Sequence, residues 1–129
     1  MNGRALVDTN VVIALFAGDP AAVKSLEGKT AVFLCVPVIG ELRYGALASA
    51  RVEQNLARLA EFSKAVEILP CDSDTAVCYS AVKLDLRKKG RPIPENDVWI
   101  AAIARQHGLT LVSRDMHFQQ IKNLDVELL

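Results

Sequence analysis

The stretch ALVDTNVVIAL, residues 5–15, is apolar at both ends and carries an acid, Asp8, in its middle. A buried carboxylate without a partner is costly, so an acid in such a position is usually neutralised, paired or bound to a cation. The residues after the first apolar run, Asp8-Thr9-Asn10, include types that favour the start of a helix. We therefore predict a strand over residues 4–8 that ends at Asp8, and a helix over residues 10–17.

Apolar stretches and helix signals alternate along the rest of the chain. The run AVFLCV, residues 31–36, has the fully apolar pattern of a central parallel strand. We expect further strands at 66–70, 109–113 and 126–129, and helices at 20–27, 37–49, 51–64, 72–89 and 94–108. Strands separated by helices predict an α/β fold with three layers, α/β/α, in which helices cover both faces of a mostly parallel sheet. We expect residues 1–129 to form one such domain.

The composition excludes several classes of protein. Fifteen Lys and Arg residues balance fifteen Asp and Glu residues, which argues against binding nucleic acid by net charge alone. The longest apolar run, residues 31–40, is too short to cross a bilayer, and the N-terminus lacks the features of a signal peptide, so we expect a cytoplasmic protein without membrane contact. The three cysteines, Cys35, Cys71 and Cys78, form no CxxC pair and are expected to be buried free thiols.

Most of the acidic residues have an ordinary explanation. Asp72 and Asp74 lie at the start of a predicted helix, where the helix dipole favours a negative charge. Glu127 lies near the C-terminus and is expected to be solvated. Four acids lack such an explanation, and the predicted elements place all of them at the carboxyl edge of the sheet: Asp8, Glu41, Asp97 and Asp115.

The joint position of these four acids points to a metal ion. Alone, Asp97 could compensate the dipole of its helix, Asp115 could belong to a turn, and Glu41 could simply be exposed. Together they would repel, since two like charges about 4 Å apart cost about 4 kcal/mol at an effective dielectric constant near 20. A cation removes this repulsion, and a set of oxygen ligands selects Mg²⁺ or Mn²⁺. Such an ion can activate water for in-line displacement at a phosphate.

Other catalytic arrangements find little support in the sequence. It contains no GxSxG nucleophile motif and no phosphate-binding glycine loop. His107 precedes Gly108 at the predicted end of a helix, and His117 is close to Asp115 but otherwise stands alone. We therefore expect neither histidine to be a ligand.

Three stretches of the sequence resemble the PIN-domain ribonucleases, and closely the VapC toxins of bacterial type II toxin–antitoxin pairs. They are LVDTNVVIAL at the start, VPVIGELRYGAL in the middle and GRPIPENDVWIAAIARQHGLTLVSRDMHF near the end. The resemblance implies that Asp8, Glu41, Asp97 and Asp115 both bind Mg²⁺ or Mn²⁺ and carry the catalysis. It also implies that Asn10 and Ser113 support this cluster.

The resemblance further implies a function and partners. Similar proteins cut RNA internally, often tRNA or rRNA, and leave 5′-phosphate and 3′-hydroxyl ends. They are held inactive by a cognate VapB-type antitoxin that inserts a basic side chain among the acids. They commonly form homodimers and assemble with the antitoxin into larger complexes on promoter DNA.

Several basic residues lie close to the acids in the sequence. A basic run precedes Asp97, and two single arginines adjoin Glu41 and Asp115. These side chains could contact RNA phosphates, although a basic helix end or a solvated surface is an equally ordinary role. The candidates are Arg43, Arg87, Lys88, Lys89, Arg91 and Arg114.

Two other functions remain open on the sequence alone. One is a catalytically silent PIN-like module that binds a partner, although the intact set of four acids speaks against it. The other is a HAD-type phosphatase, because DTNVV at residues 8–12 faintly resembles the DxDx[TV] loop of that family. In that loop the second acid is the general acid, and here Asn10 occupies its position.

Overall fold

Strands and helices alternate through residues 3–129, which are the residues that the computed structural model describes. The first two residues of the predicted 1–129 domain lie outside this part. In chain order the elements are β1 (Arg4–Val7), α1 (Thr9–Phe16), α2 (Pro20–Glu27), β2 (Ala31–Cys35), α3 (Val36–Leu47), α4 (Val52–Lys64), β3 (Glu67–Leu69), α5 (Ser73–Lys89), α6 (Glu95–His107), β4 (Thr110–Ser113), the 3-10 helix η1 (Met116–Gln120) and β5 (Val126–Leu128).

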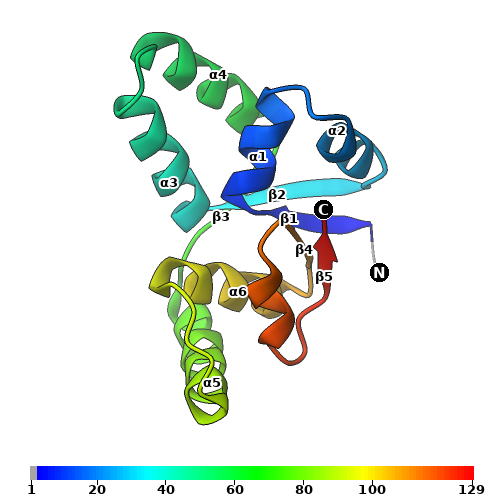
Figure 1. Ribbon diagram of the computed structural model, residues 1–129, viewed down its shortest axis with the longest axis vertical. Coiled ribbons are helices and arrows are strands. Elements are labelled where there is room, and N and C mark those ends of the chain that lie inside the picture. The colour runs from blue at the N-terminus through cyan, green and yellow to red at the C-terminus, as the bar shows by residue number, and fades with distance from the viewer. Residues whose placement is uncertain (1–2) are drawn as a thin grey trace.

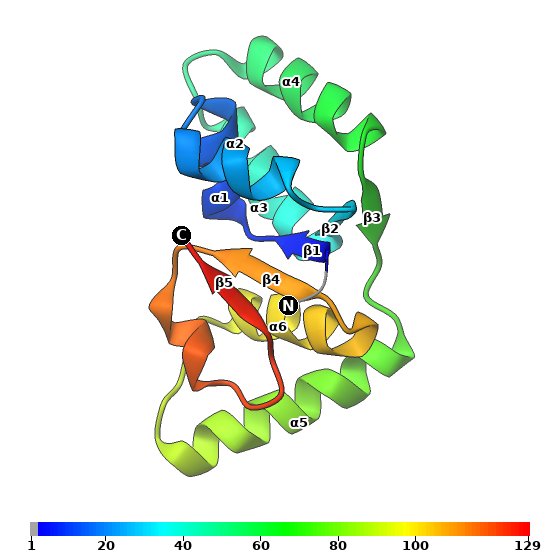
Figure 2. The same ribbon diagram turned by 90° about the vertical axis from the view of Figure 1, so that its right-hand side faces the viewer.

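The strands form one parallel sheet in the order β3-β2-β1-β4-β5. Helices α1 to α4 cover one face of this sheet, and α5 and α6 cover the other (Figures 1 and 2). The three-layer α/β/α architecture predicted from the sequence is therefore confirmed, and every strand pairing in residues 3–129 is parallel.

The core is built around the central strands and α6. Ala5, Leu6 and Val7 of β1 have no exposed surface, because β1 has a strand on each side and helices on both faces. Helix α6 is buried from Val98 to Ala104, with the exception of the half-buried Trp99. A helix that is apolar on all sides belongs in the interior, and here it lies against the sheet and α5.

The strand order creates a switch point between β1 and β4. The chain leaves β1 for β2 and β3 on one side, and then returns to the other side of β1 as β4. In open parallel sheets, ligands bind beyond the carboxyl ends of the strands at such a point. Asp8 directly follows β1 and Asp115 follows β4, so the fold brings residues more than a hundred positions apart to the same place.

Two expectations about individual side chains are wrong. Cys35 is a buried free thiol, but Cys71 is exposed and Cys78 half-buried, because Cys71 lies in the loop before α5. Glu127 is not a solvated residue: its side chain is 18% exposed and forms an ion pair with Lys29, with 2.6 Å between Oε1 and Nζ.

Within residues 3–129, none of the helices combines the length and the apolar character that crossing a membrane requires.

Candidate active site

Asp8 lies at the centre of the candidate site and is almost fully buried, with 3% of its surface exposed. It directly follows β1 and caps α1, since its Oδ1 accepts a hydrogen bond from the backbone N–H of Thr9 at 2.9 Å. Its Oδ2 accepts a second hydrogen bond from the Ser113 hydroxyl at 2.7 Å. Burial raises the pKa of Asp8 to about 6, although these two hydrogen bonds act in the opposite direction.

Two further acids, Glu41 and Asp97, lie close to Asp8 and come from helices on opposite faces of the sheet. Glu41 lies on α3 and accepts a hydrogen bond from the Thr9 hydroxyl at 2.9 Å. Asp97 lies in the first turn of α6 and is 9% exposed. Burial raises the pKa of Asp97, against the nearby His117, and the charges of Glu41 and Asp115 raise it further. One oxygen from each of Asp8, Glu41 and Asp97 lies within 4.8 Å of the other two.

Asp115 belongs to a second group that overlaps the first. Its Oδ2 accepts a hydrogen bond from the Asn10 side chain at 3.1 Å, and its backbone N–H donates to the Ser113 hydroxyl at 3.0 Å. Asp115, Asp97 and His117 offer ligand atoms that again lie within 4.8 Å of one another. The four acids singled out in the sequence thus occupy one site, and Asp97 is common to both groups.

The expectation that His117 stands alone is wrong. Its Nε2 lies 2.9 Å from Oδ2 of Asp97, across a gap of twenty residues in the sequence. The short helix η1, which is absent from the elements predicted from the sequence, turns the chain back toward the site after Asp115. The pattern Asp-x-His after a buried strand was the only available sequence signal for this contact.

The negative charge of the four acids is not neutralised by lysine or arginine side chains within the described residues. Among residues 3–129, no ion pair joins a Lys or Arg to Asp8, Glu41, Asp97 or Asp115. Carboxylate oxygens are the ligands that hard divalent cations prefer. The donor set therefore fits a divalent metal ion, which would supply the missing positive charge.

All six candidate RNA-binding residues are exposed, and two of them also form ion pairs. Arg114 forms an ion pair with Asp19 at 2.7 Å, and Lys89 pairs with Asp85 at 3.1 Å. The other four are Arg43, Arg87, Lys88 and Arg91. The chain runs from the end of α5, which carries the basic run, directly to the start of α6 and Asp97 (Figure 2).

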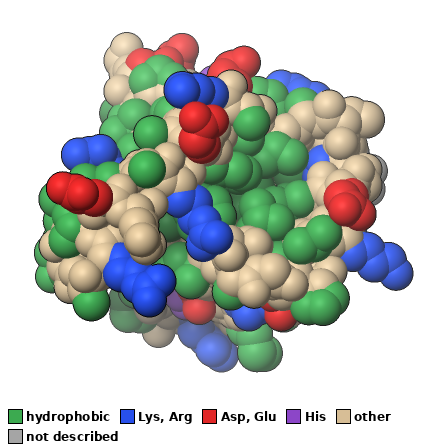
Figure 3. Space-filling model, turned by 90° about the horizontal axis from the view of Figure 1, so that it is seen from above, with side chains coloured by type: hydrophobic (Ala, Val, Ile, Leu, Met, Phe, Trp, Pro, Cys, Tyr) green, Lys and Arg blue, Asp and Glu red, His purple; other side chains and the backbone are tan. Residues whose placement is uncertain are grey.

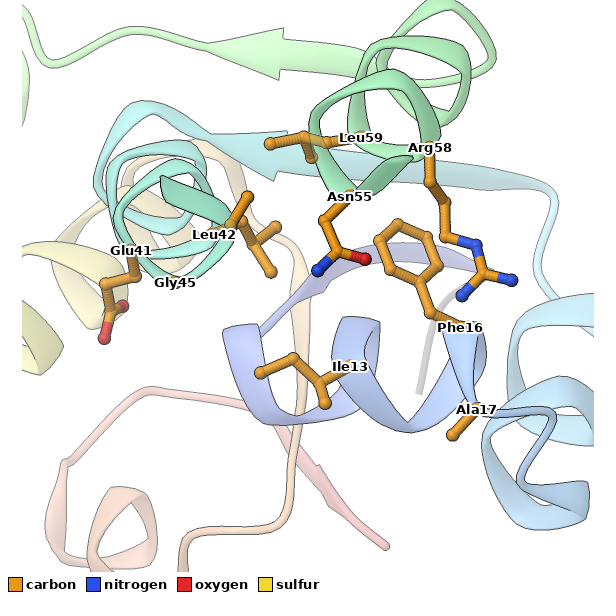
Figure 4. Close-up of a pocket in the computed structure, with 10 residues that line it drawn as sticks. Ile13, Phe16, Ala17, Glu41, Leu42, Gly45, Asn55, Arg58 and Leu59 are labelled. Atoms are coloured by element: carbon orange, nitrogen blue, oxygen red, sulfur yellow. The ribbon is translucent and has the colours of Figure 1, made fainter. Parts of the chain in front are cut away.

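A groove of about 350 Å³ adjoins the acids on the side of α1, α3 and α4. Figure 3 shows hydrophobic side chains gathered in the middle of this end of the molecule, with charged side chains around them. Figure 4 shows Glu41 toward one end of the groove, and Phe16 and Arg58 toward the other. Ile13 on the groove wall is 57% exposed, so the groove offers an uncovered apolar surface next to an acid.

Comparisons with known proteins place this geometry in a family. The PIN domain model matches residues 5–124. The chain is 35% identical to the Haemophilus influenzae protein named ribonuclease VapC2, over 95% of each chain. It is 30% identical to the Shigella flexneri protein named tRNA(fMet)-specific endonuclease VapC, also over 95% of each chain. Among solved structures, VapBC2 from Rickettsia felis bound to a DNA fragment from its promoter matches with a TM-score of 0.90 and 27% identity, over 98% of each chain.

Proposed function

Because the chain belongs to the PIN-domain family, and within it to the VapC ribonucleases, we propose that it is a metal-dependent endoribonuclease and the toxin of a toxin–antitoxin pair. The reaction is hydrolysis of RNA phosphodiester bonds. Asp8, Glu41, Asp97 and Asp115 are the proposed catalytic residues and hold the metal ion, which we propose to be Mg²⁺. Residues 1–129 act as one nuclease domain in the cytoplasm, where the RNA substrate is found.

The observation that carries this proposal is the convergence of four carboxylates, two of them buried, to which no Lys or Arg side chain is paired in the described part of the chain. Asp8 is buried beside Asp97, and the pKa of each is raised. A positive charge between them would stabilise both side chains in their ionised form. A divalent cation supplies that charge, and when bound it also activates water and stabilises the negative charge that develops on the phosphate.

The surrounding residues hold the acids in position. Ser113 bridges two of them, since its hydroxyl donates to Asp8 and accepts from the backbone N–H of Asp115. Thr9 links Asp8 to Glu41 by its backbone and its hydroxyl, and Asn10 orients Asp115. These hydrogen bonds fix the orientation of the carboxylates before substrate arrives, as supporting residues do at metal sites. We assign Asn10 and Ser113 this positioning role.

We propose that exposed basic side chains guide the RNA backbone to the acids. Arg43 lies two residues after Glu41, and the exposed Arg87, Lys88 and Arg91 lie where the chain turns toward Asp97. Lys89 and Arg114 are held by Asp85 and Asp19, so their contribution requires these ion pairs to open. We propose tRNA or rRNA as the substrate class, and the name of the Shigella flexneri relative, tRNA(fMet)-specific endonuclease VapC, supports tRNA.

The partner that fits the apolar groove is a VapB-type antitoxin segment. A helix with an apolar stripe could cover Ile13, Leu42 and Leu59, as amphipathic helices do in hydrophobic grooves. A basic side chain at the end of such a helix would reach Glu41, which lines the same groove, and neutralise the acids in place of the metal (Figure 4). A homodimer, and a larger complex with the antitoxin on DNA, complete the proposed assembly, by analogy with the DNA-bound VapBC2 structure.

The test is cleavage of RNA by the purified chain, with Asp97→Asn compared with Glu95→Gln. Both acids lie in the first turn of α6, but Glu95 is exposed and pairs with Lys83. We expect cleavage with Mg²⁺ that EDTA abolishes and that leaves 5′-phosphate ends. Asp97→Asn should lower the rate by about 10³-fold, or about 4 kcal/mol of transition-state stabilisation. Glu95→Gln should cleave like the wild type.

Three outcomes would contradict the proposal. Equal cleavage by the wild type and Asp97→Asn would mean that the activity is a contaminant and the chain is a binding module. Phosphate release with an aspartyl-phosphate on Asp8 would indicate the HAD-type phosphatase instead. Toxicity in cells that Asp97→Asn leaves unchanged would separate growth arrest from the proposed chemistry.

A further inference from the structure

His117 brings an imidazole nitrogen to the site, where the four acids offer oxygen ligands. It lies on η1, two residues after Asp115, and its ring packs against Phe118 with 4.7 Å between the ring centroids. Its Nε2 is buried and makes no hydrogen bond of ordinary geometry within residues 3–129, although it lies 2.9 Å from Oδ2 of Asp97. A buried nitrogen without a hydrogen bond of ordinary geometry, which lies beside Asp97 and within 4.8 Å of an oxygen of Asp115, is placed to bind a further atom between them.

The geometry of this group suits a single cation. The ligands of one ion can be separated by at most about twice the metal–ligand bond length, roughly 4 to 5 Å. The atoms offered by Asp97, Asp115 and His117 all lie within 4.8 Å of one another. Asp97 also belongs to the all-oxygen group with Asp8 and Glu41, so the two positions adjoin.

We propose that His117 is a metal ligand, which forms with Asp97 and Asp115 a nitrogen-containing cation position that favours Mn²⁺ over Mg²⁺. The inference rests on the proposed function, since it concerns the same metal-binding site. Carboxylates bind Mg²⁺ and Mn²⁺ alike, but an imidazole nitrogen suits transition-metal ions, whereas Mg²⁺ retains oxygen ligands and water. His117 therefore gives the site a preference that the four acids alone would lack.

The experiment uses the tag-free full chain, Mn²⁺ as the probe and the second histidine as the control. The chain contains two histidines, and the Nε2 of His107 is also buried without a hydrogen bond in the described part of the chain. His107, however, ends α6 away from the carboxylates, so His107→Ala is a matched control. Pulsed electron paramagnetic resonance of bound Mn²⁺ detects a directly coordinated nitrogen, and calorimetry measures the affinities for Mn²⁺ and Mg²⁺.

We expect nitrogen coupling in the wild type and in His107→Ala, and none in His117→Ala. The Kd for Mn²⁺ should rise by at least about tenfold in His117→Ala, while the Kd for Mg²⁺ changes by less than about twofold. His117→Gln guards against a folding defect, because its side chain offers an oxygen ligand: it should bind both ions without nitrogen coupling. Circular dichroism checks the fold of each variant.

Three results would overturn the inference. The first is a wild-type spectrum without nitrogen coupling, which is expected if His117 is only a counter-charge for Asp97. The second is nitrogen coupling that persists in His117→Ala, and the third is an equal loss of affinity for Mn²⁺ and Mg²⁺ in that variant. RNA cleavage in Mg²⁺, measured in parallel, separates this inference from the proposed function. Cleavage without nitrogen coupling removes the role of His117 alone, and nitrogen coupling without cleavage removes the nuclease alone.

Discussion

Two carboxylates at the same sheet, Asp8 and Glu127, have opposite electrostatic surroundings. Val7 pairs with Val112, which pairs with Glu127, so the two acids lie at nearly the same level of the sheet, one after the central β1 and one on the edge strand β5. Glu127 has Lys29 at 2.6 Å and accepts a hydrogen bond from the Ser25 hydroxyl. Asp8 has two hydrogen bonds and no basic side chain paired with it in residues 3–129.

The pKa values of the two groups move in opposite directions for this reason. Burial raises the pKa of Asp8 to about 6, and its hydrogen bonds do not reverse the shift. Burial also acts to raise the pKa of Glu127, but the hydrogen bonds from Lys29 and Ser25 and the charge of Lys29 lower it below its ordinary value. A carboxylate with a protein cation stabilises the fold, whereas one without such a cation is available to bind a metal ion.

Removing the cation from the edge strand should make Glu127 resemble Asp8. We expect Lys29→Met to lower the free energy of unfolding by about 2 kcal/mol at pH 7, because it leaves a mostly buried carboxylate without its partner. Chemical denaturation measures the change, and RNA cleavage per folded molecule should stay at the wild-type level. The control is Lys64→Met in the exposed pair with Glu61, which should cost about 0.5 kcal/mol or less. Equal losses of unfolding free energy in both variants would show that the buried ion pair of Glu127 stabilises the fold no more than an exposed pair does.

Removing the charge of Asp8 should instead raise the free energy of unfolding. A pKa of about 6 against an ordinary value of 3.8 corresponds to about 3 kcal/mol of destabilisation at pH 7. An amide loses part of the hydrogen bonding to Ser113 and Thr9, so we expect Asp8→Asn to raise the free energy of unfolding by about 1–2 kcal/mol in EDTA. Cleavage should be lost in the same variant.

The pH dependence of stability tests independently whether the ionised Asp8 destabilises the fold. Between about pH 4 and pH 6, Asp8 keeps its proton in the folded chain and releases it when unfolded, so the folded state binds more protons. The metal-free wild type should therefore lose stability from this group as the pH rises through that window, and Asp8→Asn should lose less. Denaturation curves at several pH values decide it; an unchanged slope would mean that Asp8 is not destabilised by burial.

Most of the fold could be predicted because local patterns determine it. The predicted helix at 94–108 and strand at 109–113 agree closely with α6 and β4, since a proline precedes α6, a left-handed glycine, Gly108, follows it, and an apolar run forms β4. The order of the strands had no such signal, because a strand buried on both faces looks the same whichever neighbours it has. The short helix η1 also lacked the periodicity that identifies longer helices.

The site, too, has a part that could be predicted from the sequence and a part that could not. Asp8 and Asp115 could be placed at one edge because each follows a buried strand, and parallel strands share that edge. The contacts of His117 with Asp97 and of Lys29 with Glu127 join residues 20 and 98 positions apart, and no local pattern encodes either. Such pairs arise from how η1 and β5 return to the sheet, which depends on tertiary packing.

The smallest expected effect concerns the two serines that donate hydrogen bonds to these carboxylates, Ser113 to Asp8 and Ser25 to Glu127. Ser113→Ala removes the hydroxyl that donates to Asp8 and accepts from the backbone of Asp115, and we expect it to cost about 1 kcal/mol of stability at pH 7. Cleavage should fall by about tenfold or more, as when supporting residues of metal ligands are lost. Ser25→Ala removes the hydroxyl that serves Glu127, but Lys29 still neutralises that acid, so stability should change less and cleavage should not change. If both variants cleaved RNA equally well, Ser113 would be a packing residue like Ser25, and the difference between the two carboxylates would not extend to the residues that hold them.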